Sequence, residues 1–309
     1  MSRSLHLFPI LLLSSCGPGI FGQQINECRS REAIVNVRDS GGAFVAGLLP
    51  SSFEANVGRQ PLRVIAAKSE HPGPRVILMI DLSASQSTRL GLTRATGRYF
   101  VEKVSGTLRV AMISFSDRTL ETVGFDHSTE DILGSISRIQ KAMGRTSLYD
   151  SLVYAVNLFG QPEIGDAIFM IGDGEDSSSK SKWDAAKRLL ASRGVRLFWF
   201  DSSGRSYSTP EERDGKDNLR NIVESSGGLI ISTPEGTSAK DSRALEMAVD
   251  GVYTSIRDFY TLTLENAPGI DERKSWSLEV LDASGKKRDL RLLFSRSMPL
   301  CLNSATPQR

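Results

Sequence analysis

Between residues 75 and 259 the sequence alternates short apolar runs with stretches of helical periodicity, and this alternation constrains the fold more than any other feature. The expected strands are residues 76–80, 109–115, 119–123, 167–171, 195–200 and 229–231. Helical stretches separate them, at residues 87–104, 131–140, 147–159, 183–192, 218–225 and 241–259. Strands that are covered on both faces read as continuous apolar runs. The pattern therefore predicts a doubly wound α/β domain with a mostly parallel sheet.

The segments on either side of this region show strand and turn patterns instead. Residues 33–38, 53–57 and 62–66 precede it, and residues 260–264, 276–280 and 290–294 follow it. Neither segment is large enough to fold as a β domain alone. We therefore expect residues 23–73 and 260–309 to combine into one small β domain, with an α/β domain at 74–259 inserted between them.

The first 22 residues have the layout of a secretory signal. Arg3 is followed by an apolar run at residues 5–13 and then by small residues. Two processing routes are open. The residues up to Cys16 resemble the bacterial lipoprotein box, in which that cysteine is lipidated, whereas cleavage near Gly22 would release a soluble chain. No later stretch is apolar over the length of a transmembrane helix. The expected location is extracytoplasmic, either periplasmic or secreted, or lipid-anchored at the cell envelope.

Export also bears on the three cysteines. Either processing route removes or consumes Cys16 and leaves Cys28 and Cys301, in a compartment that permits disulfides. We hypothesise that these two cysteines pair and join the two ends of the chain; the alternative is two unpaired thiols. In the chain-entropy model, a bridge that closes such a long loop stabilises the folded state by roughly 4–5 kcal/mol.

Oxygen-bearing side chains follow the predicted strands at the edge where ligands bind in open α/β sheets. The first buried strand runs into a D-x-S-x-S sequence at residues 81–85, and a later strand ends at Asp173. Thr146 lies between them, just before a helix. Carboxylates held close together repel each other unless a positive charge lies between them. Oxygen ligands without His or Cys favour magnesium, manganese or calcium over zinc.

The order and spacing of these residues resemble the metal-ion-dependent adhesion site (MIDAS) of von Willebrand factor A (VWFA) domains, over roughly residues 75–259. The resemblance implies a VWFA or Rossmann-like fold and one divalent cation, Mg²⁺ by preference, with Mn²⁺ or Ca²⁺ as alternatives. It also implies that Ser83, Ser85 and Thr146 ligate the metal directly, while Asp81 and Asp173 act mainly through bound water. With its β segments included, the chain is similar to bacterial exported VWFA-related proteins of the acidobacterial type.

The function that the resemblance implies is binding. A cation with few direct carboxylate ligands keeps its charge and accepts a carboxylate from an Asp or Glu of a protein partner. An adhesion or scaffold module and an envelope chaperone or assembly factor would use the same metal face, so both stay open. A metal-dependent hydrolase is a further alternative, but the sequence has no G-x-S-x-G, Walker-type or H-E-x-x-H motif, and we expect no enzymatic activity. The net charge of +2, with both signs interspersed, gives no basic stripe for nucleic acid.

Two structural interpretations compete with these functional ones. Asp81 and Ser83 could cap the helix that follows, since both residue types are preferred at helix N-termini. That interpretation leaves Thr146 and Asp173 unexplained. Glu175 and Asp176 could be further acidic groups at this edge, but the run that continues through residues 177–180 is interpreted more simply as a solvated loop.

Overall fold

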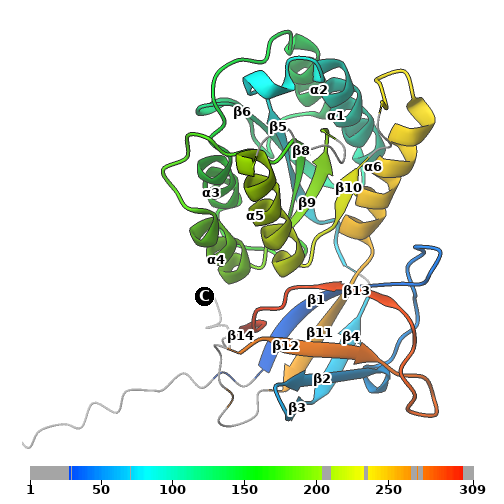
Figure 1. Ribbon diagram of the computed structural model, residues 1–309. Helices are drawn as coiled ribbons and strands as arrows, with labels where there is room; N and C mark the ends of the chain where they lie inside the picture. The colour runs from blue at the N-terminus through cyan, green and yellow to red at the C-terminus, as the bar shows by residue number, and fades with distance from the viewer. Residues whose placement is uncertain are drawn as a thin grey trace, which may run out of the picture.

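The computed structural model describes residues 28, 30–69, 71–203, 210–232, 236–265, 270 and 274–301. The predicted signal segment at residues 1–22 and the lipidation candidate Cys16 lie outside the described residues. Two layers of structure are visible in Figure 1, a helix-covered sheet above and a pair of small antiparallel sheets below. None of the helices among the described residues combines the length and the apolar content needed to cross a bilayer.

The upper part is an α/β domain around a six-stranded sheet of order β10-β9-β8-β5-β6-β7. Its strands are β5 (Arg75–Asp81), β6 (Arg109–Phe115), β7 (Thr119–Val123), β8 (Ala167–Gly172), β9 (Arg196–Asp201) and β10 (Ile230–Ser232). All neighbours pair in parallel except β7, which is antiparallel to β6. The prediction of a doubly wound, mostly parallel sheet is therefore confirmed.

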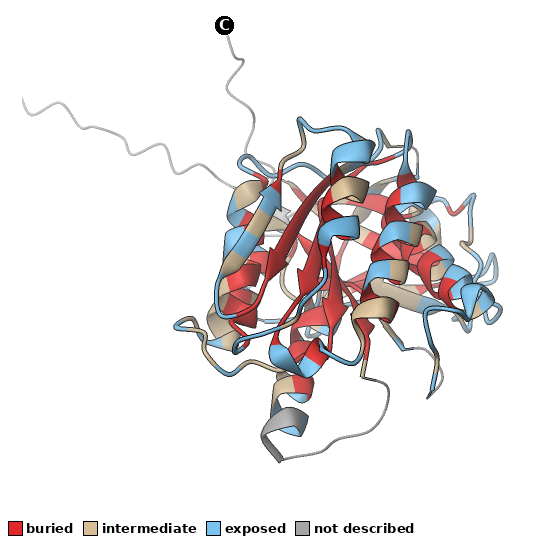
Figure 2. Ribbon diagram, turned by 90° about the horizontal axis from the view of Figure 1, so that it is seen from above, coloured by how far each residue is buried: buried red, intermediate tan, exposed pale blue. Residues whose placement is uncertain are grey.

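Helices cover both faces of this sheet. The helices are α1 (Leu90–Val104), α2 (Thr129–Arg138), α3 (Leu148–Leu158), α4 (Trp183–Arg193), α5 (Pro210–Ser226) and α6 (Ser242–Arg257). One apolar cluster joins the sheet to α1, α2 and α6, and a second joins its other face to α3, α4 and α5. Every residue of β5, β8 and β9 is buried as a result, as the red strands of Figure 2 show. This sandwiching explains the continuous apolar runs in the sequence.

The lower part is built from both ends of the chain. A five-stranded sheet contains β13 (Arg291–Phe294), β1 (Ser30–Arg38), β11 (Tyr260–Glu265) and β4 (Val64–Lys68) in that order, with β14 (Leu300–Cys301) also paired to β1. A three-stranded sheet has the order β12 (Trp276–Val280), β2 (Phe53–Val57), β3 (Gln60–Leu62). Strand β2 follows the short helix η1 (Pro50–Ser52). Apolar side chains from both sheets pack into one cluster. The small β domain made from both chain ends is confirmed.

One predicted strand of this domain is wrong in detail. Residues 62–66 were expected to form a single strand, but they belong to two, β3 and β4, which separate at Arg63 and lie in different sheets. A chain that passes from one sheet of a sandwich to the other must bend at the corner. The apolar pattern continues across that bend, so the pattern alone does not reveal it.

The disulfide between Cys28 and Cys301 is present, with 5.7 Å between the Cα atoms and a sequence separation of 273. It lies beside the short ladder in which β14 pairs with β1. Bridge and ladder thus fix the two ends of the chain to the same sheet, and the alternative of two unpaired thiols is wrong.

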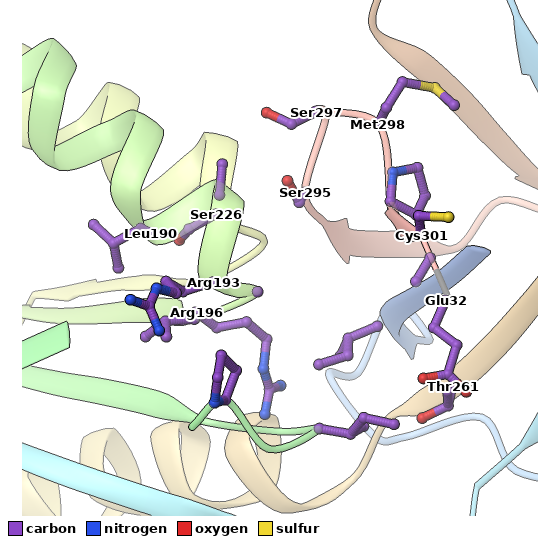
Figure 3. Close-up of a pocket in the computed structure, with 18 of the residues that line it drawn as sticks. Glu32, Leu190, Arg193, Arg196, Ser226, Thr261, Ser295, Ser297, Met298 and Cys301 are labelled. Carbon is purple, nitrogen blue, oxygen red and sulfur yellow. The ribbon is translucent and has the colours of Figure 1, made fainter. Parts of the chain in front are cut away.

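The two domains meet where α6 continues into β11. Arg196 of β9 donates hydrogen bonds to the carbonyls of Ser255 and Ile256 at 3.0 and 2.9 Å, and so satisfies the end of α6. The guanidinium is buried, which lowers its pKa to about 9. Figure 3 shows Arg196 beside a cavity of about 210 Å³ that both domains line, with Thr261 on the opposite wall. These contacts lie around the connection between α6 and β11. We call this region the domain junction.

Candidate metal centre

The D-x-S-x-S segment forms a tight turn at the carboxyl end of β5. Asp81 Oδ1 accepts a hydrogen bond from the backbone N–H of Ser83 at 2.8 Å, and the hydroxyls of Ser83 and Ser85 lie 3.0 Å apart. Asp81 and Ser83 are buried, whereas Ser85 is exposed. The three predicted site residues of this segment therefore lie together, with Asp81 and Ser83 in the interior and Ser85 at the surface.

The structure rules out the helix-capping interpretation of this segment. Ser83 precedes only the single turn η2 (Ala84–Gln86), and its side chain makes no capping hydrogen bond there. Helix α1 starts at Leu90 and has Arg89 at its N-cap position. The side chains of Asp81 and Ser83 are thus free of a capping role at α1.

Asp173 follows β8, the strand next to β5. Residues Ile80 and Ile171 pair in the parallel ladder, so the two strands end side by side. Asp173 Oδ1 accepts a hydrogen bond from the N–H of Glu175 at 3.1 Å. Gly172 leaves the room that this arrangement needs, because a Cβ there would lie 2.8 Å from Asp81 Cβ and 3.0 Å from Asp81 Oδ2. The two carboxylates are brought together across a position that only glycine fits.

The electrostatics of this carboxylate pair are unbalanced. Burial, with a further contribution from the nearby charge of Asp173, raises the pKa of Asp81 to about 7. Asp81 Oδ2 is buried and has no hydrogen-bond partner among the described residues. Among the described residues, the cation that pairs with these carboxylates is Arg89, whose Nη1 lies 4.0 Å from Asp173 Oδ2 and whose side chain is one-third exposed. A buried carboxylate oxygen without a partner is costly, and a bound cation would remove that cost.

Thr146 is held beside the D-x-S-x-S turn by backbone hydrogen bonds. Met143 donates to the carbonyl of Leu82 at 2.8 Å, and Ala84 donates to the carbonyl of Gly144 at 3.1 Å. Gly144 adopts a φ of +85°, a conformation that favours glycine. Thr146 itself is buried. The loops that carry all five predicted ligands thus gather at the carboxyl ends of β5 and β8.

The serine-rich run after Asp173 is a loop with Ser177 exposed, as expected, but it also makes specific contacts with the Thr146 loop. Thr146 donates its N–H to Ser177 Oγ at 3.0 Å, and its carbonyl accepts the N–H groups of Ser177 and Ser178, both at 2.9 Å. Asp176 Oδ1 accepts the N–H of Leu148 at 2.9 Å. The segment therefore joins the Asp173 loop to the Thr146 loop.

The start of helix α3 has backbone N–H groups that need acceptors, and the same serine-rich run supplies one. Its N-cap residue, Ser147, makes no capping hydrogen bond with its own side chain. The free N–H groups of Tyr149 and Asp150 bind Ser179 Oγ instead, at 3.0 and 3.2 Å. Because Tyr149 and Ser179 are 30 positions apart, the sequence gives no local signal of this contact.

The residues present fit a hard divalent cation. They offer two carboxylates and three hydroxyls, and no histidine or cysteine. Across residues 28–301, in the parts that the structure describes, no group of three or more His, Cys, Asp or Glu side chains gathers in a way suited to a metal. A site at this edge would therefore depend on hydroxyl oxygens as well as carboxylates.

A comparison with protein families agrees with this geometry. The sequence profile of the family described as "VWA domain containing CoxE-like protein" matches residues 49–248. The chain belongs to this family. VWA domains generally mediate protein interactions, which places the chain among protein-interaction modules.

Several solved structures resemble parts of this VWA chain at low sequence identity. An aerotolerance-related membrane protein from Bacteroides fragilis is 17% identical, with 60% of this chain and 98% of that one covered and a TM-score of 0.48. BatB from Bacteroides thetaiotaomicron is 16% identical, with coverages of 60% and 100% and a TM-score of 0.45. A von Willebrand factor type A protein from Catenulispora acidiphila is 13% identical, with coverages of 88% and 75% and a TM-score of 0.46. No protein with a curated description matches the sequence.

Proposed function

We propose that this chain is an exported protein-binding module that uses one divalent cation, Mg²⁺ by preference, to capture an Asp or Glu carboxylate of a partner. The observation that supports this most is Asp81 Oδ2, which is buried beside Asp173 and has no hydrogen-bond partner among the described residues. Ser83, Ser85 and Thr146 would hold the cation, and Asp81 and Asp173 would orient its water. The bound cation supplies positive charge for a partner's carboxylate.

The chain's own residues determine how a partner would approach. Ser85 is the exposed member of the five residues, so the approach is from its side of the turn. Met143, with 59% of its surface exposed, and Arg145 lie on the same rim, in the loop that carries Thr146. These side chains offer an apolar and a cationic contact next to the site. A partner segment with an acidic residue beside an apolar one would complement this rim.

An extracytoplasmic location is part of the proposal. The disulfide between Cys28 and Cys301 supports it, because such bridges persist in oxidising compartments. Secretion into the periplasm or medium and lipid anchoring at Cys16 stay as alternatives, and a measurement of acyl mass on the purified protein separates them.

We infer that the role is binding without catalysis. The two histidines among the described residues lie in other parts of the fold. The ring of His71 stacks on Phe259 with 4.2 Å between centroids, at the domain junction, and His127 pairs with Asp126 in an exposed turn before α2. A Ser–His–Asp arrangement at the carboxylate pair would need a histidine there.

Metal binding is tested by thermal unfolding of the full chain in EDTA and in MgCl₂ or MnCl₂. A cation at about 100 times its Kd should stabilise the fold by about 2.7 kcal/mol and raise Tm. Asp81→Asn should abolish the rise, while Asp117→Asn, which changes an exposed carboxylate outside the pair, should retain it. A full rise in Asp81→Asn would place the ion elsewhere.

Partner binding is tested with the wild-type chain and the Asp81→Asn variant as baits in envelope extracts, with MgCl₂ or EDTA. The proposal requires capture of the same protein only by wild type and only with Mg²⁺. Blocking carboxylates in the extract by amidation should remove that capture. Capture of many unfolded envelope proteins would instead favour the chaperone or assembly-factor alternative.

A further inference from the structure

A second polar site lies at the domain junction, at the end of the molecule opposite the candidate metal centre. The cleft has a volume of about 510 Å³ and is lined by the end of α5, the start of β10 and strand β13. Because β10 is parallel to β9, its start lies at the amino end of the sheet, whereas the candidate metal centre lies at the carboxyl ends. Both domains therefore contribute to a cleft that the metal-site residues do not reach.

The cleft is strongly basic. Its lining includes four cationic side chains and one carboxylate, namely Lys187, Arg220, Arg291, Arg296 and Glu224. The three arginines are exposed, and in the part of the chain that the structure describes no ion pair joins any of them to a carboxylate. Lys187 donates to Asn221 Oδ1 at 2.6 Å, and the guanidinium of Arg296 lies 4.3 Å from the ring centroid of Phe294. Neither contact supplies a negative charge, so the cleft keeps an excess of positive charge over the single carboxylate of Glu224.

One of these arginines is placed at an electrostatic cost. Arg291 lies directly opposite Arg38 in the antiparallel ladder between β13 and β1. Like charges in opposite positions of a ladder destabilise it. An anionic ligand near Arg291 would offset this repulsion.

Two edge strands contribute residues to the lining of the cleft. Strand β13 is the end strand of the five-stranded sheet, and β10 is the end strand of the six-stranded sheet. An edge strand leaves half of its N–H and C=O groups without a strand partner, which makes it a template for another extended segment. Phe294 is buried in the β-domain core, so Leu293, which lines the cleft, points to the opposite face of β13.

The base of the cleft is a close contact between the two backbones. Gly227, at a φ of +80°, packs so tightly that a Cβ there would lie 2.7 Å from the carbonyl carbon of Phe294 and from the nitrogen of Ser295. This contact fixes β13 relative to α5. The arginines of both elements are therefore held at one opening.

We propose that this cleft binds an acidic, extended peptide segment of a partner protein. The segment adds its main chain to the free edge of β13, places carboxylates near Arg220, Arg291 and Arg296, and lays an apolar side chain against Leu293. A compact anion such as phosphate would use the arginines but not the strand edge or Leu293. The site is independent of the candidate metal centre, so this binding persists in EDTA.

The test is fluorescence anisotropy of the full, disulfide-bonded chain with a labelled decapeptide of alternating Glu and Val, in EDTA. Binding should weaken when NaCl is raised from about 50 to 500 mM, because salt screens exposed charges. The affinity of the double variant Arg291→Gln/Arg296→Gln for the decapeptide should be lower by a factor of about ten or more. Arg59→Gln/Arg243→Gln removes the same charge from exposed positions outside the cleft and should change affinity less than about twofold.

Further probes separate a peptide from other anions. A decapeptide N-methylated at alternate residues on one edge keeps its charge but cannot add to a strand, so it should lose binding. Equal affinity for this peptide would overturn the proposal, and so would equal losses in the two double variants. Inorganic phosphate or dextran sulfate that binds in the cleft when the decapeptide does not would also overturn it, as would the absence of binding by any probe.

Discussion

Three neighbouring strands of the parallel sheet, β5, β8 and β9, each end in a turn of the same kind that begins with an aspartate. Among the described residues, a buried cationic side chain lies beside one of these aspartates, Asp201. The carboxylates of Asp81, Asp173 and Asp201 each accept the N–H of the residue two positions on, at 2.8, 3.1 and 3.0 Å. Lys216 of α5 is 2% exposed and places its Nζ 3.9 Å from Asp201 Oδ2. It also hydrogen-bonds Ser203 Oγ, which donates to Asp201 at 2.5 Å.

The carboxylate pair at Asp81 and Asp173 differs from Asp201 in the charges that surround it. Burial raises the pKa of Asp201, but the hydrogen bond from Ser203 and the charge of Lys216 both act against this shift. At Asp81 the neighbouring charge is another carboxylate, which adds to the effect of burial. Arg89 approaches only the Asp173 side and is partly solvated. The turn at Asp201 thus has a buried cation from the chain, whereas among the described residues the pair at Asp81 and Asp173 has only the partly exposed Arg89. Our proposal of a bound cation rests on this difference.

The comparison predicts its largest effect for Lys216→Met. This variant leaves Asp201 buried without its cation, and removing one partner of a buried ion pair costs about 3–5 kcal/mol. The free energy of unfolding, measured with urea, should fall by that amount, whereas Lys240→Met at an exposed position should change it little. The further change Asp201→Asn in the Lys216→Met background should recover part of the loss. If Lys216→Met lowers the free energy of unfolding by less than about 1 kcal/mol, Lys216 does not stabilise Asp201 as a buried ion pair, and the proposed difference between the two turns is wrong.

The sequence predicted that Asp81 and Asp173 lie at one edge of the sheet, but it did not predict the contacts of Asp201 with Lys216 and Ser203. The D-x-S-x-S run and Asp173 follow continuous apolar strands, so their position at one edge follows from sheet topology. Asp201-Ser202-Ser203 repeats the D-x-S pattern after β9, so the sequence contains a signal for this turn as well. Its partner Lys216 could not be found, because its burial depends on the packing of α5.

The extent of α5 shows the same limit. The prediction placed a helix only at residues 218–225, where Leu219, Ile222 and Val223 repeat on one face, whereas the helix begins at Pro210. The residues before Lys216 are mostly charged and give no apolar period. The contact between Ser177 and Thr146 was not predicted for a related reason, since a hydrogen bond between residues 31 positions apart leaves no periodic pattern in the sequence.

The next effect is the pH dependence of the metal-free protein. The pKa of Asp81 is raised from 3.8 to about 7 in the folded state, so between these values the folded state binds more protons than the unfolded state. Stability should therefore fall as pH rises from about 4 to 7, by at most about 4 kcal/mol from this group. Urea unfolding in EDTA measures this slope, and Asp81→Asn should flatten it.

A divalent cation should reverse that trend. With MgCl₂ present, the ionised carboxylate is the form that the cation favours, so the stability difference between MgCl₂ and EDTA should grow as pH rises towards 8. Asp201→Asn should leave this difference in place, because its turn has Lys216 instead. A metal effect that is equal at pH 5 and pH 8 would contradict a site built on Asp81.

The smallest expected effect concerns Ser177, which joins the Asp173 loop to the Thr146 loop. Ser177→Ala removes the acceptor for the N–H of Thr146 and should cost about 1 kcal/mol of stability in EDTA. Because Thr146 is then held less firmly, the affinity for Mn²⁺, measured by calorimetry, should fall several-fold. Ser192→Ala, which removes a hydroxyl bound within the last turn of α4, serves as the matched control and should leave the Mn²⁺ affinity unchanged. Since Ser177→Thr retains a hydroxyl, it should restore most of the lost affinity. A Ser177→Ala variant that loses stability but binds Mn²⁺ as tightly as wild type would limit this serine to holding the loop and would show that Thr146 does not depend on it for position.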